Sequence, residues 1–185
     1  VRGGGRVQGW RRAWQAAGGW GGVLAGVGVL AGGVAGRHGW SPGPVMKGVE
    51  VMDGLVTARR VIARLVEFAS SRGHTPVKAR DTPGFLVNHA GRGYGTEALR
   101  IVGEGIADAP TVDRILKLEA GFRMGPFELL DLTGLDVSHP VMESIYHQYY
   151  EEPRFRPSPL TAQRLAAGLL GRKSGRGFYD YRGID

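Results

Sequence analysis

The stretch that decides the fold of this chain is Asp81-Thr82-Pro83-Gly84-Phe85-Leu86-Val87-Asn88. Thr82 is a residue type that caps helices, and Pro83 suits a first helical turn, where a missing N–H costs nothing. The stretch therefore predicts the start of a long helix that runs from Pro83 to about Ile106. Asn88 falls about one and a half turns into that helix. Its side-chain amide offers both a hydrogen-bond donor and an acceptor.

Downstream of this stretch, apolar residues recur with helical spacing, which indicates helices rather than strands. Pro159 suits the first position of the last helix if Ser158 caps it. The further helices are predicted at residues 110–118, 126–132, 141–150 and 158–167. Residues 81–185 are therefore predicted to form an all-α domain of about five helices.

Upstream of it, the pattern changes to a strand, a helix and a second strand. β-branched residues in Val45–Val51 favour a strand, and a helical stripe follows from Leu55 to Arg72. A second short strand is predicted at Thr75–Ala79. Residues 42–80 thus predict a β-α-β piece of the Rossmann type, so that the whole chain is mainly α.

The first 41 residues differ from the rest in composition. Residues 1–40 use only eight residue types and hold all four tryptophans and 14 of the 32 glycines. They lack the polar residues that cap helices and close turns. We predict that this head is disordered or is translated out of frame. A natural flexible Gly/Trp/Arg-rich arm and a genuine, divergent segment of the sheet are the alternatives.

One motif in the head resembles a dinucleotide fingerprint. Gly26-Val27-Gly28-Val29-Leu30-Ala31 fits the form G-x-G-x-x-A, which needs a strand before it, a helix after it and an acidic residue about 20 positions on. Arg- and Trp-rich sequence precedes the motif. In a segment so rich in glycine we interpret the match as chance, and no cofactor-binding residue is predicted from it.

Charge and composition narrow the classes of function. Residues 1–44 carry five arginines and no acid, whereas the other residues carry 19 basic and 17 acidic side chains. A nucleic-acid interface would therefore depend on the head alone, and none is predicted. The chain has no cysteine, which excludes disulfides, and no run of about 20 strongly apolar residues predicts a membrane span. A cytoplasmic location agrees with this composition.

Three motifs together resemble one family. They are Pro44-Val45-Met46-Lys47-Gly48-Val49-Glu50-Val51, the stretch at residues 81–88, and Gly171-Arg172-Lys173-Ser174-Gly175-Arg176-Gly177-Phe178-Tyr179-Asp180-Tyr181. Over residues 42–182 the chain resembles the NAD-dependent 3-hydroxyacyl-CoA dehydrogenases, and among these the 3-hydroxybutyryl-CoA enzymes. The resemblance implies an acyl-CoA substrate, NAD as cofactor and a homodimer formed through the helical domain.

The resemblance also implies catalytic residues. The family's histidine run, His-Phe-Phe-Asn-Pro-x-Pro-Val-Met, corresponds to His38-Gly39-Trp40-Ser41-Pro42-Gly43-Pro44-Val45-Met46. His38 falls on the general base, Glu50 on its orienting carboxylate and Asn88 on the asparagine that orients the substrate. A histidine held by a carboxylate suits the removal of a hydroxyl proton. The other histidines, His74, His89, His139 and His147, are interpreted as surface or packing residues.

The expected activity is NAD-dependent oxidation of a 3-hydroxyacyl-CoA to the 3-oxoacyl-CoA, in fatty acid or butanoate metabolism. This chain is expected to be a truncated form, because the resemblance reaches only the end of the nucleotide-binding domain. The alternative is a non-catalytic helical module for dimerisation and substrate contact. NAD binding distinguishes the two, since the enzyme requires it and the module does not.

Overall fold

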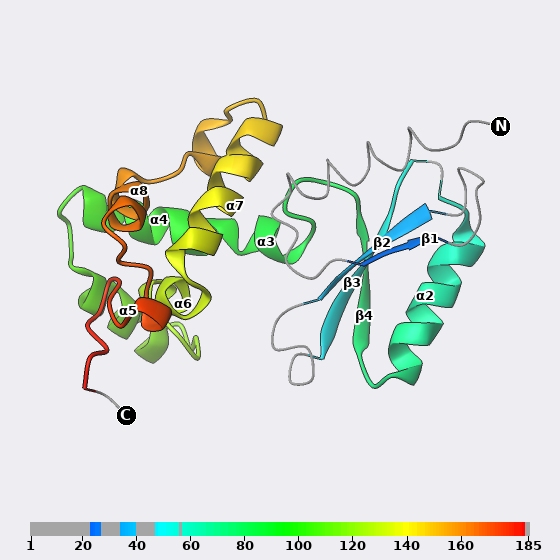
Figure 1. Ribbon diagram of the computed structural model, residues 1–185, viewed down its shortest axis with the longest axis horizontal. Coiled ribbons are helices and arrows are strands. Elements are labelled where there is room, and N and C mark those ends of the chain that lie inside the picture. Colours follow the sequence, from blue (N-terminus) through cyan, green and yellow to red (C-terminus); the bar gives the residue numbers. More distant parts are fainter. Residues whose placement is uncertain (1–22, 27–33, 40–46, 56, 184–185) are drawn as a thin grey trace. The chain divides into compact units, whose positions relative to one another are not determined.

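The structure is a computed structural model that describes residues 23–26, 34–39, 47–55 and 57–183. The chain divides into two compact units, residues 1–89 and residues 90–185. The first unit contains the strands and one long helix, and the second is helical (Figure 1).

The described strands of the first unit form a four-stranded sheet in the order β1-β2-β3-β4. β1 to β2 and β2 to β3 are antiparallel pairs, whereas β3 and β4 are parallel and are joined through the helix α2. The β-α-β piece predicted from the sequence is therefore present. The bounds are β1 Val23–Gly26, β2 Val34–Gly39, β3 Gly48–Asp53, α2 Arg59–Ser71 and β4 Thr75–Arg80.

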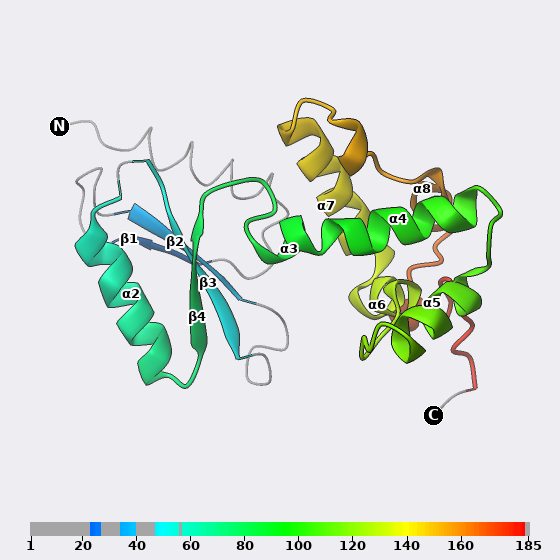
Figure 2. The same ribbon diagram turned by 180° about the vertical axis from the view of Figure 1, so that it is seen from behind.

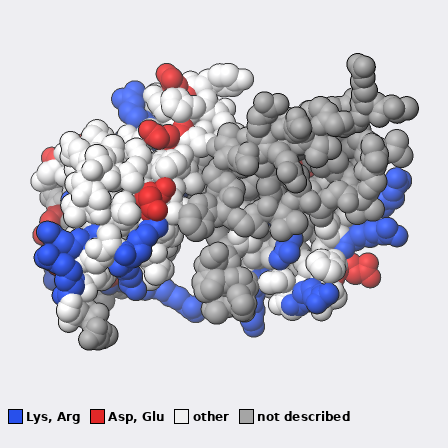
Figure 3. Space-filling model, viewed as in Figure 1, with Lys and Arg blue, Asp and Glu red and all other residues white. Residues whose placement is uncertain are grey.

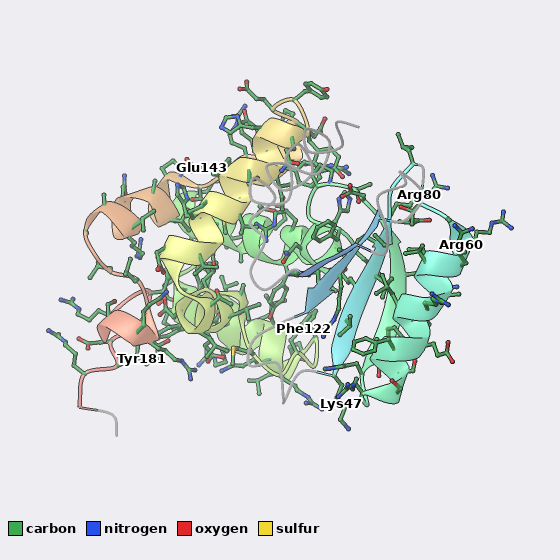
Figure 4. The ribbon with its side chains drawn as sticks, turned by 45° about the vertical axis from the view of Figure 1, so that its right-hand side comes forward. Lys47, Arg60, Arg80, Phe122, Glu143 and Tyr181 are labelled. Carbon is green, nitrogen blue, oxygen red and sulfur yellow. The ribbon has the colours of Figure 1, made fainter. Side chains whose placement is uncertain are left out.

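The two faces of β3 have different roles because successive side chains of a strand point to opposite faces. Val49 and Val51 pack with Val61 and Ile62 of α2 in a buried apolar cluster. Figures 1 and 2 show α2 lying along one face of the sheet, and in Figure 4 the labelled Arg60 extends from α2 away from the strands. Glu50 lies between Val49 and Val51, so its carboxylate is on the face opposite α2.

The strands β1 and β2 both fall within residues 1–41, which the sequence predicts to be disordered. The prediction is wrong for residues 23–26 and 34–39, which form strands. Backbone hydrogen bonds to β3 support β2 in register, from Ala35 opposite Asp53 to Gly39 opposite Val49. The composition gave no sign of this because β2, Val-Ala-Gly-Arg-His-Gly, has two glycines and only one β-branched residue. Residues 1–22, 27–33 and 40–41 of the head lie outside the described part of the chain.

The predicted long helix from Pro83 is also wrong at its start. Residues 82–85 form a turn in which the Phe85 N–H donates to the Thr82 carbonyl at 2.8 Å. Gly84 has a φ of +79°, and Pro followed by such a glycine is the signature of a type II turn. A short helix, α3 (Val87–Ala90), then precedes α4 (Arg92–Gly103).

The second unit contains four further α-helices, and α6 packs against α4, α5 and α7 (Figure 1). Asp108 caps α5 by accepting from the Thr111 N–H, and Ser158 caps α8 as the sequence predicts. The bounds are α5 Ala109–Leu118, α6 Pro126–Thr133, α7 Leu135–Gln148 and α8 Pro159–Ala166, with short 3₁₀ turns η2 Pro153–Phe155 and η3 Arg172–Ser174. None of the helices in the described ranges has the length and apolar character needed to cross a membrane.

Helix α7 begins at Leu135, six residues before its predicted start at Val141, and Pro140 lies inside the helix. Proline removes one backbone donor and usually marks a helix boundary, which is why the sequence favours a later start. Here the turn ahead of Pro140 is held by other bonds, since the Val137 and Ser138 N–H groups both donate to the Gly134 carbonyl.

Two buried carboxylates organise the second unit around its C-terminal segment. Asp113 accepts from the Phe127 and Glu128 N–H groups at 2.9 Å and from the Tyr179 hydroxyl at 2.7 Å. Asp131 accepts from the N–H groups of residues 178 and 179 at 2.9 Å and from the Tyr181 hydroxyl at 3.1 Å. Each carboxylate is 1% exposed. Residues 178–181 are thereby bound to α5 and α6 through charge-assisted hydrogen bonds.

Glycines allow residues 171 and 177 to lie close to Asp131. A Cβ at Gly171 would collide with the backbone of Asp131, and a Cβ at Gly177 would collide with the carboxylate of the same residue. Gly171 also has a φ of +107°, in the left-handed region that favours glycine. The glycines of the C-terminal motif are therefore packing and turn residues.

Candidate active site

A histidine and a glutamate from neighbouring strands form a direct pair in the sheet unit. His38 on β2 lies opposite Glu50 on β3. The His38 Nδ1 and the Glu50 Oε2 are 2.9 Å apart, and the two residues are 4% and 1% exposed. A carboxylate only accepts hydrogen bonds, so Nδ1 is the donor, and in the neutral ring the lone pair is then on Nε2. This is the tautomer in which Nε2 can act as a base.

The second oxygen of Glu50 binds the backbone at the start of α3. The Leu86 N–H donates to Oε1 at 2.9 Å and the Val87 N–H donates to the same atom at 2.8 Å. Glu50 thus has separate partners for its two oxygens, with the histidine on one and two backbone amides on the other. This arrangement fixes the rotation of the carboxylate and hence the orientation of the ring.

Asn88 lies in α3, half-buried, directly after the amides that bind Glu50. It is linked to the histidine pair through this backbone contact. The structure therefore brings His38 and Glu50 into direct contact and holds the helix that carries Asn88 against the same carboxylate.

Sequence reasoning missed the contribution of residues 85–87. Phe85 is 6% exposed, and its ring centroid is 5.5 Å from that of His38 at an angle of 46°. The signal was available in Pro83-Gly84, which is a turn dipeptide before it is a helix start. A turn there frees the next N–H groups from helical bonding and leaves them available to a carboxylate.

Of the remaining histidines, His89 lies in α3 directly after Asn88, and His139 and His147 lie on α7. His139 is buried on α7, where its Nδ1 is 2.9 Å from the Thr161 hydroxyl oxygen, and its Nε2 is 3.5 Å from Glu143. The Thr161 contact links α7 to α8, whereas Glu143 lies on α7 itself, so His139 has a packing role. Among the described residues no group of three or more His, Cys, Asp or Glu side chains has the arrangement of a metal site.

Basic side chains gather on one part of the helical unit, seen at the lower left of Figure 3. In the C-terminal motif, Lys173 forms an ion pair with Asp136 at 2.5 Å and Arg176 one with Asp180 at 3.7 Å. The Arg172 guanidinium lies 5.4 Å from the ring centre of Tyr181, which is labelled in Figure 4. These contacts place the three basic residues in local structure, and none of them is assigned to a substrate phosphate.

Two family profiles match the chain, one after the other. The 3-hydroxyacyl-CoA dehydrogenase NAD binding domain matches residues 30–82, and the 3-hydroxyacyl-CoA dehydrogenase C-terminal domain matches residues 84–181. The first match takes in both His38 and Glu50, and the second takes in Asn88. NAD is the cofactor named for the first domain.

Individual relatives agree with the profiles. The 3-hydroxyadipyl-CoA dehydrogenase of Escherichia coli is 46% identical over 80% of this chain and 31% of its own length. The mitochondrial hydroxyacyl-coenzyme A dehydrogenase of Sus scrofa is 40% identical over 80% of this chain and 47% of its own length. The chain therefore spans 31% to 47% of the length of these two curated relatives.

Solved structures give the same result. A 3-hydroxybutyryl-CoA dehydrogenase from Escherichia coli matches with a TM-score of 0.79 and 40% identity, over 88% of this chain and 36% of that one. A (S)-3-hydroxybutyryl-CoA dehydrogenase from Ralstonia eutropha matches with a TM-score of 0.75 and 37% identity, over 78% of this chain and 51% of that one. The resemblance predicted from the sequence is confirmed, and the chain belongs to the 3-hydroxyacyl-CoA dehydrogenase family of oxidoreductases.

Proposed function

We propose that the protein containing this chain oxidises a 3-hydroxyacyl-CoA to the 3-oxoacyl-CoA with NAD, as a step of fatty acid or butanoate metabolism. Residues 42–80 would be the end of the nucleotide-binding domain and residues 81–185 the helical domain. The observation that carries the proposal is the buried pair of His38 and Glu50, with Nδ1 to Oε2 at 2.9 Å. A cytoplasmic location, which the absence of cysteine supports, is part of the same proposal.

The pair supplies the proton chemistry of alcohol oxidation. His38 Nε2 takes the proton of the substrate's 3-hydroxyl group, and the ring becomes an imidazolium. The Glu50 carboxylate, whose other oxygen is held by two N–H groups, stabilises this cation and keeps the ring in place. The amide of Asn88 orients the substrate by hydrogen bonding to its thioester carbonyl. NAD, when bound, would accept the hydride that leaves C3 of the substrate, the carbon that carries this hydroxyl group.

The described residues do not fit the phosphate part of NAD. Only seven residues separate β1 from β2, and these strands pair antiparallel. A dinucleotide fingerprint needs a strand-turn-helix crossover of a dozen or more residues. The G-x-G-x-x-A motif runs from Gly26 into this short connection, whose residues 27–33 are outside the described part of the chain. We therefore assign no residue of this chain to NAD.

The alternative is a non-catalytic helical module for dimerisation and substrate contact. The test uses the protein expressed from its complete gene, with NAD and (S)-3-hydroxybutyryl-CoA, followed by NADH absorbance at 340 nm. We expect NADH to form with this substrate and not with butyryl-CoA, which lacks the hydroxyl group. Absence of both NADH formation and NAD binding in calorimetry, with acyl-CoA binding retained, would establish the helical module instead.

Reading the encoding DNA across the first 50 codons in all three frames provides an independent check. The proposal expects one frame, here or upstream, to give a strand, a glycine-rich turn and a helix. Absence of such a frame in the gene and its upstream flank would count against an enzyme that binds NAD by itself.

The homodimer is also a proposal. The sequence favours the helices in residues 85–106 and 141–150 for the contact, but Leu99 of the first and Ile145 of the second are buried inside the unit, at 1% and 0% exposure. Apolar side chains are exposed instead on α5, on α6 and on the loop between them, which carries the labelled Phe122 of Figure 4. They are Ile115, Leu118, Phe122, Leu129 and Leu132, 41% to 72% exposed. We propose that this α5–α6 surface contacts a second copy of the chain.

We expect sedimentation velocity of the chain to give a dimer and of the double variant Leu118→Ser and Leu132→Ser to give a monomer. Both side chains are already exposed, so the change leaves the core of the monomer intact. Leu55→Ser, at an exposed position of the sheet unit, is the matched control and is expected to stay dimeric. A dimer that persists in the double variant would disprove the assigned surface.

A further inference from the structure

Phe85 has a backbone conformation that is unfavourable for its side chain. Its φ of +48° follows a φ of +79° at Gly84, so two consecutive residues are left-handed. For a residue other than glycine this conformation is sterically unfavourable. Such outliers persist where the surrounding structure requires them, and they gather at functional sites.

The left-handed backbone at Phe85 has a direct consequence for Glu50. It turns the chain so that the next two N–H groups, of Leu86 and Val87, converge on the Glu50 Oε1 at 2.9 and 2.8 Å. Successive N–H groups that follow a left-handed residue form a concave receptor for an anion. The carboxylate they hold is the one that faces His38 through its other oxygen.

The side chain of Phe85 lies beside His38, the other member of the pair. Its ring lies 5.5 Å from the His38 ring, and it also packs with Met52 and Ala79 on the same face of the sheet. Phe85 is thus adjacent to the histidine through its ring and to the glutamate through its backbone. The two contacts come from one residue, through its ring to His38 and through its backbone to Glu50.

We propose that Phe85 is a positioning residue of the catalytic pair: its backbone shapes the amide receptor for Glu50, and its ring limits rotation of His38. This inference rests on the proposed function for its catalytic meaning. It requires no contact between Phe85 and substrate. If Phe85 has this role, the neutral His38 ring holds a single tautomer, with the proton on Nδ1.

The direct test is ¹⁵N NMR of the histidine rings in the chain as it stands. The unaltered chain is expected to show the neutral His38 ring in the Nδ1-protonated form alone. Phe85→Leu keeps apolar volume at the position and is expected to give a mixture of both tautomers with a faster-exchanging Nδ1 proton. Phe68→Leu, which changes a 48%-exposed phenylalanine on α2, is the matched control and should leave the His38 signals unchanged.

Phe85→Gly separates the two contributions, because glycine accepts a positive φ without strain but carries no ring. It should retain the amide receptor and lose only the restraint on the ring. In the protein expressed from its complete gene, Phe85→Leu should lower kcat about tenfold and change KM less than twofold, since a misplaced base slows chemistry more than binding.

A single His38 tautomer in both Phe85 variants, with kcat unchanged, would overturn the inference. The outcome is separable from that of the proposed function. A protein without dehydrogenase activity whose His38 tautomer still depends on Phe85 supports the positioning role and rejects the activity. An active enzyme whose His38 tautomer and kcat do not change in the Phe85 variants supports the activity and rejects the positioning role.

Discussion

Replacing His38 by alanine in the protein expressed from its complete gene is expected to lower kcat by about 10²–10⁴-fold, the usual contribution of a general base. His38 Nε2 is the proposed proton acceptor, and no nearby group is assigned to replace it. KM should change little, since substrate orientation is assigned to Asn88. The measurement is the initial rate of NADH formation at saturating NAD, over a range of 3-hydroxyacyl-CoA concentrations.

Two comparison variants make this result specific. His74→Ala, in the turn before β4, removes a half-buried imidazole from the same unit and is expected to retain activity. Glu50→Gln is expected to reduce kcat as well, because a neutral amide stabilises the imidazolium less. The double variant should be no worse than His38→Ala alone, since both residues act as one unit. Additive losses, or activity that survives His38→Ala, would rule out the assigned base.

Replacing Asp131 by alanine is expected to destabilise the helical unit by about 3–5 kcal/mol. The change leaves two backbone N–H groups and the Tyr181 hydroxyl without their acceptor, and an unsatisfied buried donor costs about 1–3 kcal/mol. It also creates a cavity, because Asp131 is 1% exposed. Urea denaturation followed by circular dichroism measures the loss.

Asp136→Ala is the matched control for this prediction. Asp136 pairs with Lys173 at 2.5 Å, but both side chains are 41% exposed, so the pair contributes only about 0–1 kcal/mol. Equal destabilisation by the two substitutions would show that the Asp131 hydrogen bonds do not support the fold.

Titration of Tyr181 offers a second readout at Asp131. Burial, and then the negative charge of Asp131, raises the pKa of Tyr181 to about 12. A raised pKa favours the neutral phenol in the folded state, so this stabilisation is present below about pH 10 and is lost as the pH rises through 12. In Asp131→Ala the phenol should ionise at a lower pH, which absorbance at 295 nm detects.

The helical unit could be predicted from the sequence because its signals are local. Asp108, Ser158 and the prolines after them mark helix starts by chemistry that acts within one turn. The errors occurred where a local signal competed with a tertiary one. Pro140 appeared to be a helix boundary although the helix continues through it, and Thr82-Pro83 appeared to be a helix start although Gly84 makes it a turn.

Only those residues of the candidate site that lie in family motifs could be predicted from the sequence. His38, Glu50 and Asn88 came from their places in recognisable runs, and the structure then placed the first two in contact. The strand that carries His38 was missed because its pairing with β3 is a long-range property that composition does not encode. The backbone amides that hold Glu50 were also missed, because every residue except proline carries an N–H group and the sequence does not mark which ones bind a carboxylate.

The attachment of residues 178–181 to Asp113 and Asp131 has a consequence for synthesis of the protein. The bonds join residues up to 66 positions apart in the chain. During translation α5 and α6 leave the ribosome well before these partners, so both carboxylates stay hydrated until Tyr179 and Tyr181 emerge. The helical unit can complete its folding only after residues 178–181 have left the ribosome. A change that removes these residues would therefore prevent the whole unit from reaching its native state.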